Sequence, residues 1–234
     1  MTGRRSIILC VLLGALIFGW MGWGWIGRRS QSGQPRETPE PTIDKQLVVF
    51  ASRTFDPASP PADMPPLPPG EQAECDSNFL SNASVGGESR QTDATHATVT
   101  VTRINVTLQL SIAVWVPAGV TQHVSEHEEG HRQISEYYYQ TADKLAGRIA
   151  APYMGKQVAI SGADQQAESG KALQQIGAEI TDEYNKELNP EPTQLRYDDI
   201  TDHSRNEVVA QDAVAQAIHE MTLASTEAAT IPPN

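Results

Sequence analysis

The sequence contains very little cysteine. Only Cys10 and Cys75 are present among 234 residues, and Cys10 lies within an apolar run, so the two are not expected to pair within one chain. The fold therefore has to be stable without an internal disulfide. No activating base lies near Cys75 in the sequence, which argues against a nucleophilic role and leaves a buried thiol or an intermolecular bridge.

Positive charge is scarce beyond the first 29 residues. The formal net charge is −12, and residues 1–29 contain four arginines and no acidic residue. The remaining chain has 13 basic and 29 acidic residues, a net charge of −16. We therefore expect no nucleic acid or anionic lipid as a partner of this part, and neutral or cationic partners are favoured.

One long hydrophobic run is present. Residues 6–27 carry no charge, have a pair of arginines at each end and contain three tryptophans toward their far end. This length spans a bilayer, and the tryptophans suit its interface. A cleavable signal peptide is the alternative, but no A-x-A site follows the run. We expect residues 1–29 to be a single-pass membrane anchor, with the bulk of the chain extracytoplasmic, either periplasmic or at the cell surface.

The rest of the chain is long enough for one core. Residues 30–43 are polar and proline-dotted, which predicts a tether, and we expect the domain to comprise residues 44–228. A short strand is expected at 46–50. The proline-rich segment 57–70 is either a surface excursion of the domain or a second linker, and residues 81–95 are expected to form a loop.

Strict alternation of apolar residues begins at Thr98 and predicts a half-buried strand. The apolar phase changes near Arg103, so the segment is either a hairpin or one long bent strand. Pro117 ends it. Helical periodicity follows, first to Pro152 and then over 163–188. After the breaker Asn-Pro-Glu-Pro a third helix is predicted over 204–223, which gives an α+β fold with a small antiparallel sheet packed on a long helix and two further helices.

The first of these helices contains an H-E-x-x-H motif, His127-Glu128-Glu129-Gly130-His131. Residues four apart share one helix face, so the two histidines can bind one zinc ion. Glu128 lies beside them, where a carboxylate can take a proton from an activated water. The apolar residues on the same face place this motif on the buried side of the helix.

Other interpretations of the motif stay open. Ser125 and Glu128 have the spacing of a capping box, in which Glu128 would only satisfy the first helical turn. His123 lies four residues before His127 and is a competing ligand. Gly130 costs a helix about 1 kcal/mol relative to alanine, which suggests that another backbone passes close to it.

A catalytic zinc takes three protein ligands and leaves one position open, so a third ligand has to come from beyond the first helix. We expect His203 to supply it and Tyr197 to donate a hydrogen bond to the oxyanion. The weaker candidates for the third ligand are Glu179, Asp182, Glu183, His96 and His219. Candidates to hydrogen-bond a ligating imidazole are Asp198, Asp199 and Asp202. Without a metal, the same stretch would be a solvated acidic turn followed by the helix cap Ser204.

The His-Glu-Glu-Gly-His helix and the later Tyr197-Asp198-x-x-Thr201-x-His203 element resemble a family of predicted secreted zinc-dependent bacterial proteases, catalogued as a domain of unknown function. The resemblance covers residues 98–205. It implies a zincin-like fold and matches His127, Glu128, His131 and His203 to motif positions of that family. One departure is Ser204, because the family has glycine at this position.

We therefore expect a membrane-anchored zinc metallopeptidase that hydrolyses a peptide or protein substrate of the cell envelope. Zn2+ would be held by His127, His131 and His203, with Glu128 as the general base. The alternative is a non-catalytic membrane-tethered domain with a structural zinc or a protein-binding role. A third hypothesis, an amidase or other hydrolase of envelope polymers, would have the same metal site as the peptidase.

Overall fold

The alternating segment forms β4, His96–Pro117, the central strand of the sheet. The computed structural model describes residues 39–67 and 70–230. Of the alternating side chains, Ile104 and Leu108 are 1% and 0% exposed and belong to the main hydrophobic core. Burial of alternate residues on one face of β4 is what the pattern predicted, and that prediction is confirmed.

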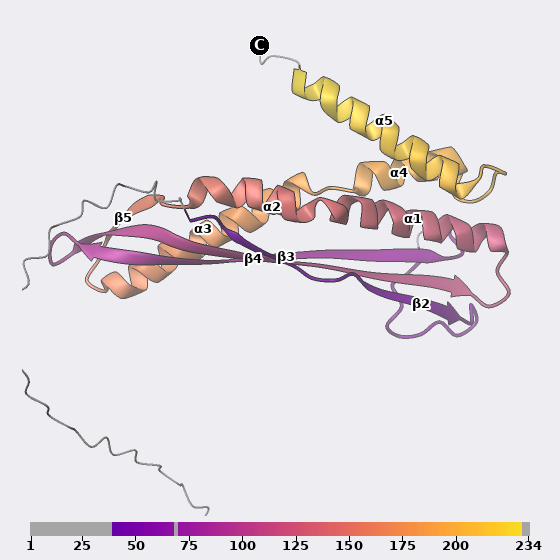
Figure 1. Ribbon diagram of the computed structural model, residues 1–234. Coiled ribbons are helices and arrows are strands. Elements are labelled where there is room, and N and C mark those ends of the chain that lie inside the picture. Colours follow the sequence, from indigo (N-terminus) through magenta and orange to yellow (C-terminus); the bar gives the residue numbers. More distant parts are fainter. Residues whose placement is uncertain (1–38, 68–69, 231–234) are drawn as a thin grey trace, which may run out of the picture. The chain divides into compact units, whose positions relative to one another are not determined.

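β4 has a different kind of neighbour on each edge. On one edge it pairs with β3, Glu74–Gln91, along most of both strands (Figure 1). Three short strands cover the other edge in succession: β5, Gln157–Ser161, antiparallel, then β1, Thr42–Lys45, and β2, Val49–Phe55, both parallel to β4. The five-stranded sheet is therefore mixed, and the predicted antiparallel sheet was wrong, because local sequence does not set the direction of a strand that arrives from elsewhere.

Strand β3 corrects another prediction. Residues 81–95 were expected to be a loop, but β3 continues to Gln91. Their Ser, Asn and Gly content disfavours a strand, and pairing with the long, regular β4 overrides it. The phase change near Arg103 is a bulge, where the register shifts between Gly86 and Gly87, so β4 is one long bent strand. The proline-rich segment joins β2 to β3 within one sheet and is thus an excursion, not a linker.

Two helices on one face of the sheet come from the predicted first helix. These are α1, Gln122–Gln140, and α2, Ala142–Ala150, with the break at Thr141. Thr121 caps α1 and accepts a hydrogen bond from the backbone N–H of Val124, so the capping box with Glu128 was wrong. Helix α3, Gln165–Glu187, crosses the middle of β3 and agrees with the predicted second helix.

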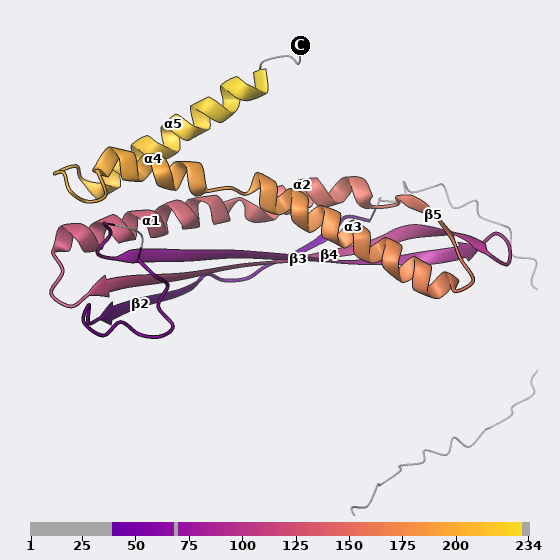
Figure 2. The ribbon, with the colours of Figure 1, turned by 180° about the vertical axis from the view of Figure 1, so that it is seen from behind.

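The predicted helix breaker does separate two helices, because α3 ends just before it, but its last two residues already belong to a helix that was not predicted. Helix α4, Glu191–Thr201, has Pro192 in its first turn, where a missing N–H removes no helical hydrogen bond. Asp202 ends α4 in a left-handed conformation, and α5, Ala210–Thr230, begins later than the predicted third helix. Figures 1 and 2 show α4 and α5 on the side of α1 that faces away from the sheet.

The predicted membrane segment, residues 6–27, lies outside the described residues. Within residues 39–67 and 70–230, no helix combines the length and apolar character that a membrane crossing requires. Strand β1 begins at Thr42, inside the stretch predicted to be a tether.

Close packing of α3 on β3 leads to a stability prediction. A Cβ added at Gly177 would lie 2.6 Å from the carbonyl oxygen of Ala83, whereas one added at Gly170 of the same helix would meet nothing within 4 Å. We expect Gly177→Ala to lower the free energy of unfolding by about 1–3 kcal/mol through overpacking. Gly170→Ala, the control, should raise it by up to about 1 kcal/mol through helix propensity. Urea denaturation measures both, and equal effects would contradict the packing argument.

Candidate metal centre

Helix α1 turns two imidazole rings toward one point. His127 and His131 are one helical turn apart, and their Nε2 atoms lie 3.2 Å apart. His127 is only 2% exposed. The structure thus brings together the two histidines of the motif on the buried side of the helix, as their place on the apolar stripe predicted.

Asp198 of α4 completes the group. Its Oδ1 atom lies 2.9 Å from Nε2 of His131 and 3.4 Å from Nε2 of His127. Among the described residues, these three side chains form a cluster that could hold a metal ion. The triangle thus consists of two imidazole nitrogens from one helix and one carboxylate oxygen from another.

The size of the triangle can be compared with a tetrahedral zinc site. Zinc bonds to imidazole nitrogen and carboxylate oxygen are about 2.0–2.2 Å long, which separates neighbouring ligand atoms by about 3.3–3.6 Å. The observed separations of 2.9, 3.2 and 3.4 Å come close to this range. The donor set therefore suits one small divalent cation, with a fourth position left for a water or a substrate.

The electrostatics of the three donors also call for a cation. Oδ1 of Asp198 is buried and has no hydrogen bond of good geometry within the described part of the chain. Burial alone would raise the pKa of Asp198, but the two adjacent imidazoles outweigh it and hold this pKa well below its usual range. A carboxylate that stays ionised beside two imidazole nitrogens is arranged as a metal ligand would be.

The other nitrogen of each histidine is held by α4. Oε1 of Gln194 lies 2.6 Å from Nδ1 of His131, and Oγ1 of Thr201 lies 3.3 Å from Nδ1 of His127. Since Oγ1 of Thr201 donates its own hydrogen to the carbonyl oxygen of Tyr197, it accepts from the histidine. With a cation in the triangle, both rings would carry hydrogen on Nδ1 and present the lone pair of Nε2 to that ion.

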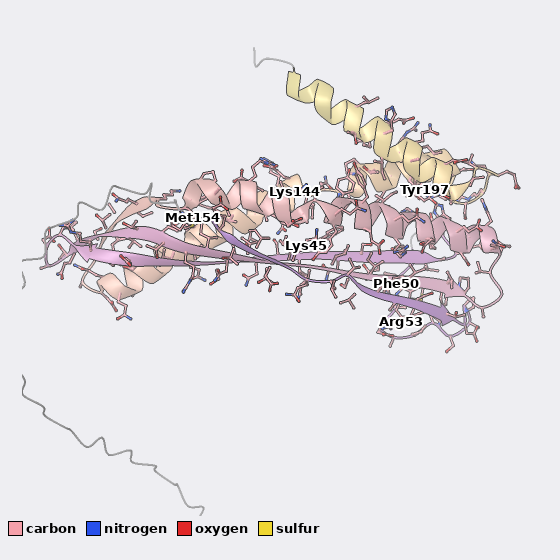
Figure 3. The ribbon with its side chains drawn as sticks, viewed as in Figure 1. Lys45, Phe50, Arg53, Lys144, Met154 and Tyr197 are labelled. Atoms are coloured by element: carbon pink, nitrogen blue, oxygen red, sulfur yellow. The ribbon has the colours of Figure 1, made fainter. Side chains whose placement is uncertain are left out.

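Tyr197 docks α4 on α1 (Figure 3). Its ring stacks on that of His127 with 5.0 Å between centroids, and its hydroxyl donates to the carbonyl oxygen of His127. A Cβ at Gly130 would overlap this hydroxyl. The close neighbour expected at Gly130 is thus a tyrosine ring and not a backbone. Because Tyr197 is fully buried, its hydroxyl is placed to position α1, whereas an oxyanion donor would face the cavity.

A cavity of about 520 Å³ opens beside the triangle, lined by the start of β3, by α1 and by α4. Glu128 lines it and is 3% exposed. Burial raises the pKa of Glu128 to about 8, against the opposing charge of His131 and with the help of nearby carboxylates. Without a cation this carboxyl therefore holds a proton at pH 7. A divalent ion nearby would favour its ionised form.

His203, the predicted third ligand, lies beside the triangle and outside it. Its Nδ1 is 2.6 Å from Oε1 of Glu71 and 3.9 Å from Oδ1 of Asp198. It still lines the same cavity. The backbone here is unusual, because Asp202, His203 and Ser204 have φ angles of 47°, 53° and 63°, a left-handed region that side chains other than glycine disfavour.

The weaker candidates are elsewhere. His96 pairs with Asp93 at the far end of β4, and Lys156 is the ionic partner of Glu179. None of the other candidates joins the cluster, which within the described residues comprises His127, His131 and Asp198; they are His123, Asp182, Glu183, Asp199, Asp202 and His219. Cys75 lines the cavity, but burial raises the pKa of its thiol to about 12, which disfavours the reactive thiolate.

Sequence reasoning passed over Gln194 and treated Asp198 only as a partner of a ligand. A signal for both was present. Gln194, Tyr197, Asp198 and Thr201 are spaced at i, i+3, i+4 and i+7, which is one face of a helix. The prolines at 190 and 192 mask this pattern in the sequence, because they resemble a break between helices and not the first turn of one.

Docking through Tyr197 predicts that Gly130 is needed for metal binding. Gly130→Ala should displace Tyr197, and with it Asp198, so that the affinity for a divalent metal ion falls by about 10-fold to 100-fold, the range known for outer-shell changes. Gly147→Ala on α2 is the control, since a Cβ there would meet only Ile43, at 4.0 Å. Competition with a chromogenic chelator measures both affinities. An unchanged affinity in Gly130→Ala would show that the docking contact does not support the site.

Comparison of the chain with protein families, with curated proteins and with solved structures gives no match. The properties of the site therefore follow from its own geometry. That geometry is a group of two imidazoles and one carboxylate that can hold a metal ion, next to a cavity that contains a buried glutamate.

Proposed function

We propose that the protein is a zinc-dependent metallopeptidase of the cell envelope. The observation that carries the proposal is the triangle of His127, His131 and Asp198 beside a cavity lined by Glu128. Three protein donors and an open fourth position are the arrangement of catalytic zinc sites, whereas structural sites use four protein ligands. This difference favours an enzyme over a domain with a structural zinc.

The chemistry divides between the ion and the chain. When bound, zinc would act as a Lewis acid that activates water and stabilises negative charge on a carbonyl oxygen. Glu128 takes the proton of the attacking water and passes it to the leaving amine. Gln194 and Thr201 keep the two imidazoles in the tautomer that binds the ion. Tyr197 fixes the helix on which the carboxylate ligand lies.

A peptide substrate has a strand on which to bind. The first residues of β3, Glu74 to Ser77 and Phe79, line the cavity, and among the described strands β3 pairs only with β4. Its other edge can therefore hydrogen-bond an extended peptide. β4, which ends just before α1, has partners on both edges and therefore has no edge left for a peptide.

A metal-bearing helix beside an open strand edge supports the zincin-like assignment and the likeness to secreted zinc-dependent proteases. The backbone at Ser204 adds to it. A residue with φ of 63° occupies a conformation that glycine adopts without strain, and glycine is what that family has at this position. The predicted anchor at residues 6–27 would place the domain outside the cytoplasm, tethered to the membrane.

Mutations can show whether the third zinc ligand, beside the two histidines of α1, is Asp198 or His203. Asp198→Asn removes the anionic donor and should weaken zinc binding by at least about 100-fold, more than an outer-shell change does. His203→Gln should change zinc affinity by less than about 3-fold, because His203 lies outside the triangle. Chelator competition on the full-length chain measures both. The opposite order of effects would assign the third ligand to His203.

The role of Glu128 has its own test. Glu128→Gln keeps the size of the side chain but removes the proton acceptor, so peptide hydrolysis should fall at least about 100-fold with zinc content unchanged. Zinc content is measured by elemental analysis and turnover with a mixture of fluorogenic peptides. Glu129→Gln is the matched control on the neighbouring residue, which pairs with Arg132 away from the cavity. Turnover by Glu128→Gln comparable to that of the unmutated protein would refute the role.

A further inference from the structure

The cavity beside the metal centre has an unusual lining. Six of its lining residues are acidic, and none is lysine or arginine; its only basic side chains are those of three histidines. The acidic residues are Glu71, Glu74, Asp76, Glu128, Glu191 and Asp198. A divalent ion in the triangle would offset only two of these charges. An excess of negative charge therefore remains beside the site of reaction.

Carboxylates elsewhere in the described chain are compensated differently. Many pair with lysine or arginine, as Asp143 does with Lys45 at 3.0 Å and Glu220 with Arg196 at 2.6 Å. No ion pair of the described residues joins a carboxylate of the cavity to a lysine or an arginine. Glu71 and Asp198 form ion pairs with histidines. Within the described part of the chain, Glu74 and Asp76 form no ion pair with a basic side chain.

The buried carboxyl of Glu128 is a second and independent observation. Glu128 is only 3% exposed and lines the cavity, and it takes part in no hydrogen bond within the described residues. Proteins rarely bury a carboxyl without a partner. Burial raises the pKa of the neighbouring Glu74, and Asp76 and Glu71 add to this shift while His131 opposes it. The acidic groups thus repel one another, and a bound cation would relieve the repulsion.

We infer that the cavity binds a substrate that carries a positive charge next to the scissile bond, and that Glu74 and Asp76 are the residues that recognise this charge. The inference rests on the proposed function. Both residues lie at the start of β3, the strand whose free edge can hold the peptide, and share the face of the strand opposite Ser77, which contacts α1. A cationic group of a peptide on that edge that points to this face therefore lies beside them. Among the other acidic residues, Asp198 is already proposed as a metal ligand and Glu128 as the general base.

Two cationic groups of a peptide fit this description, a lysine or arginine side chain and a free α-amino group. Amino-acid hydroxamates test both without turnover, since the hydroxamate occupies the open position of the metal. The probes are the hydroxamates of N-acetyl-lysine, norleucine, N-acetyl-norleucine and N-acetyl-glutamate, bound to the zinc-loaded full-length chain in calorimetric titrations. The N-acetyl-lysine probe carries a positive charge on its side chain, and the norleucine probe carries one on its free amine. The N-acetyl-norleucine probe is neutral, and the N-acetyl-glutamate probe carries a negative charge on its side chain.

We expect at least one cationic probe to bind about 10-fold more tightly than N-acetyl-norleucine hydroxamate, and the glutamate probe to bind more weakly. The cationic probe that binds more tightly identifies the side chain or the amine as the recognised group. In Glu74→Gln and in Asp76→Asn this preference should fall, toward equal binding in the double variant. Glu88→Gln, at the far end of the same strand and outside the cavity, should keep it.

The outcomes separate this inference from the function on which it rests. Equal binding of the cationic, neutral and acidic probes would overturn the recognition of charge and leave the open metal site intact. A preference that survives in the double variant would overturn the assignment to Glu74 and Asp76. Failure of all four probes to bind the zinc-loaded chain would refute the open coordination position and, with it, the proposed enzyme. Binding of a second zinc ion that depends on Glu74 would mean that a metal, and not a substrate, is the missing cation.

Discussion

The packing of Tyr197 against Gly130 is the contact on which the candidate site depends. Helix α1 alone supplies two imidazoles, and these reach a carboxylate only because α4 lies directly against the turn that bears them. The absence of a side chain at Gly130 lets the tyrosine ring approach, and stacking on His127 sets the helix at this depth. One face of α4 then delivers a ligand and two outer-shell partners together. The site is thus a consequence of helix packing more than of any single motif.

The sheet places the β3 side of the cavity in a similar way. β4 is long, and its apolar face is buried in the core. The backbone N–H and C=O groups of a buried strand need hydrogen-bond partners on both of its edges. Three short strands cover one edge, and the single long strand β3 covers the other. Helix α3 closes the middle of β3, where the backbone N–H of Ala83 donates to Thr181. The first residues of β3 lie outside this contact with α3, and these are the residues next to the candidate metal centre.

The parts of this arrangement that the sequence predicted are the local ones. The motif on α1 and the buried face of β4 follow from spacings of four and two residues, which short-range geometry determines. The sequence predicts His203 as the third donor, since nothing short of the helix over 191–201 brings Asp198 to the two histidines. Pro190 and Pro192 look like breakers in sequence, yet a proline in a first helical turn is compatible with the helix that follows. The long β3 was missed since its composition is that of a loop, and its partner strand decides its structure.

Several features of the site are unfavourable on their own, and they share one explanation. Three consecutive residues adopt left-handed backbone angles, a conformation that costs about 1 kcal/mol or more for each residue with a side chain. Two imidazole lone pairs and a carboxylate converge, and Glu128 is buried without a hydrogen bond. The extended hydrophobic core offsets these terms, because it lies mainly between β4 and α1 to α3 and does not depend on the strained segment. Positive charge in the cavity would relieve the electrostatic features among these, the converging donors and the buried Glu128, whereas the backbone strain is steric. Structural strain of this kind is retained where it prepares a site for its ligand.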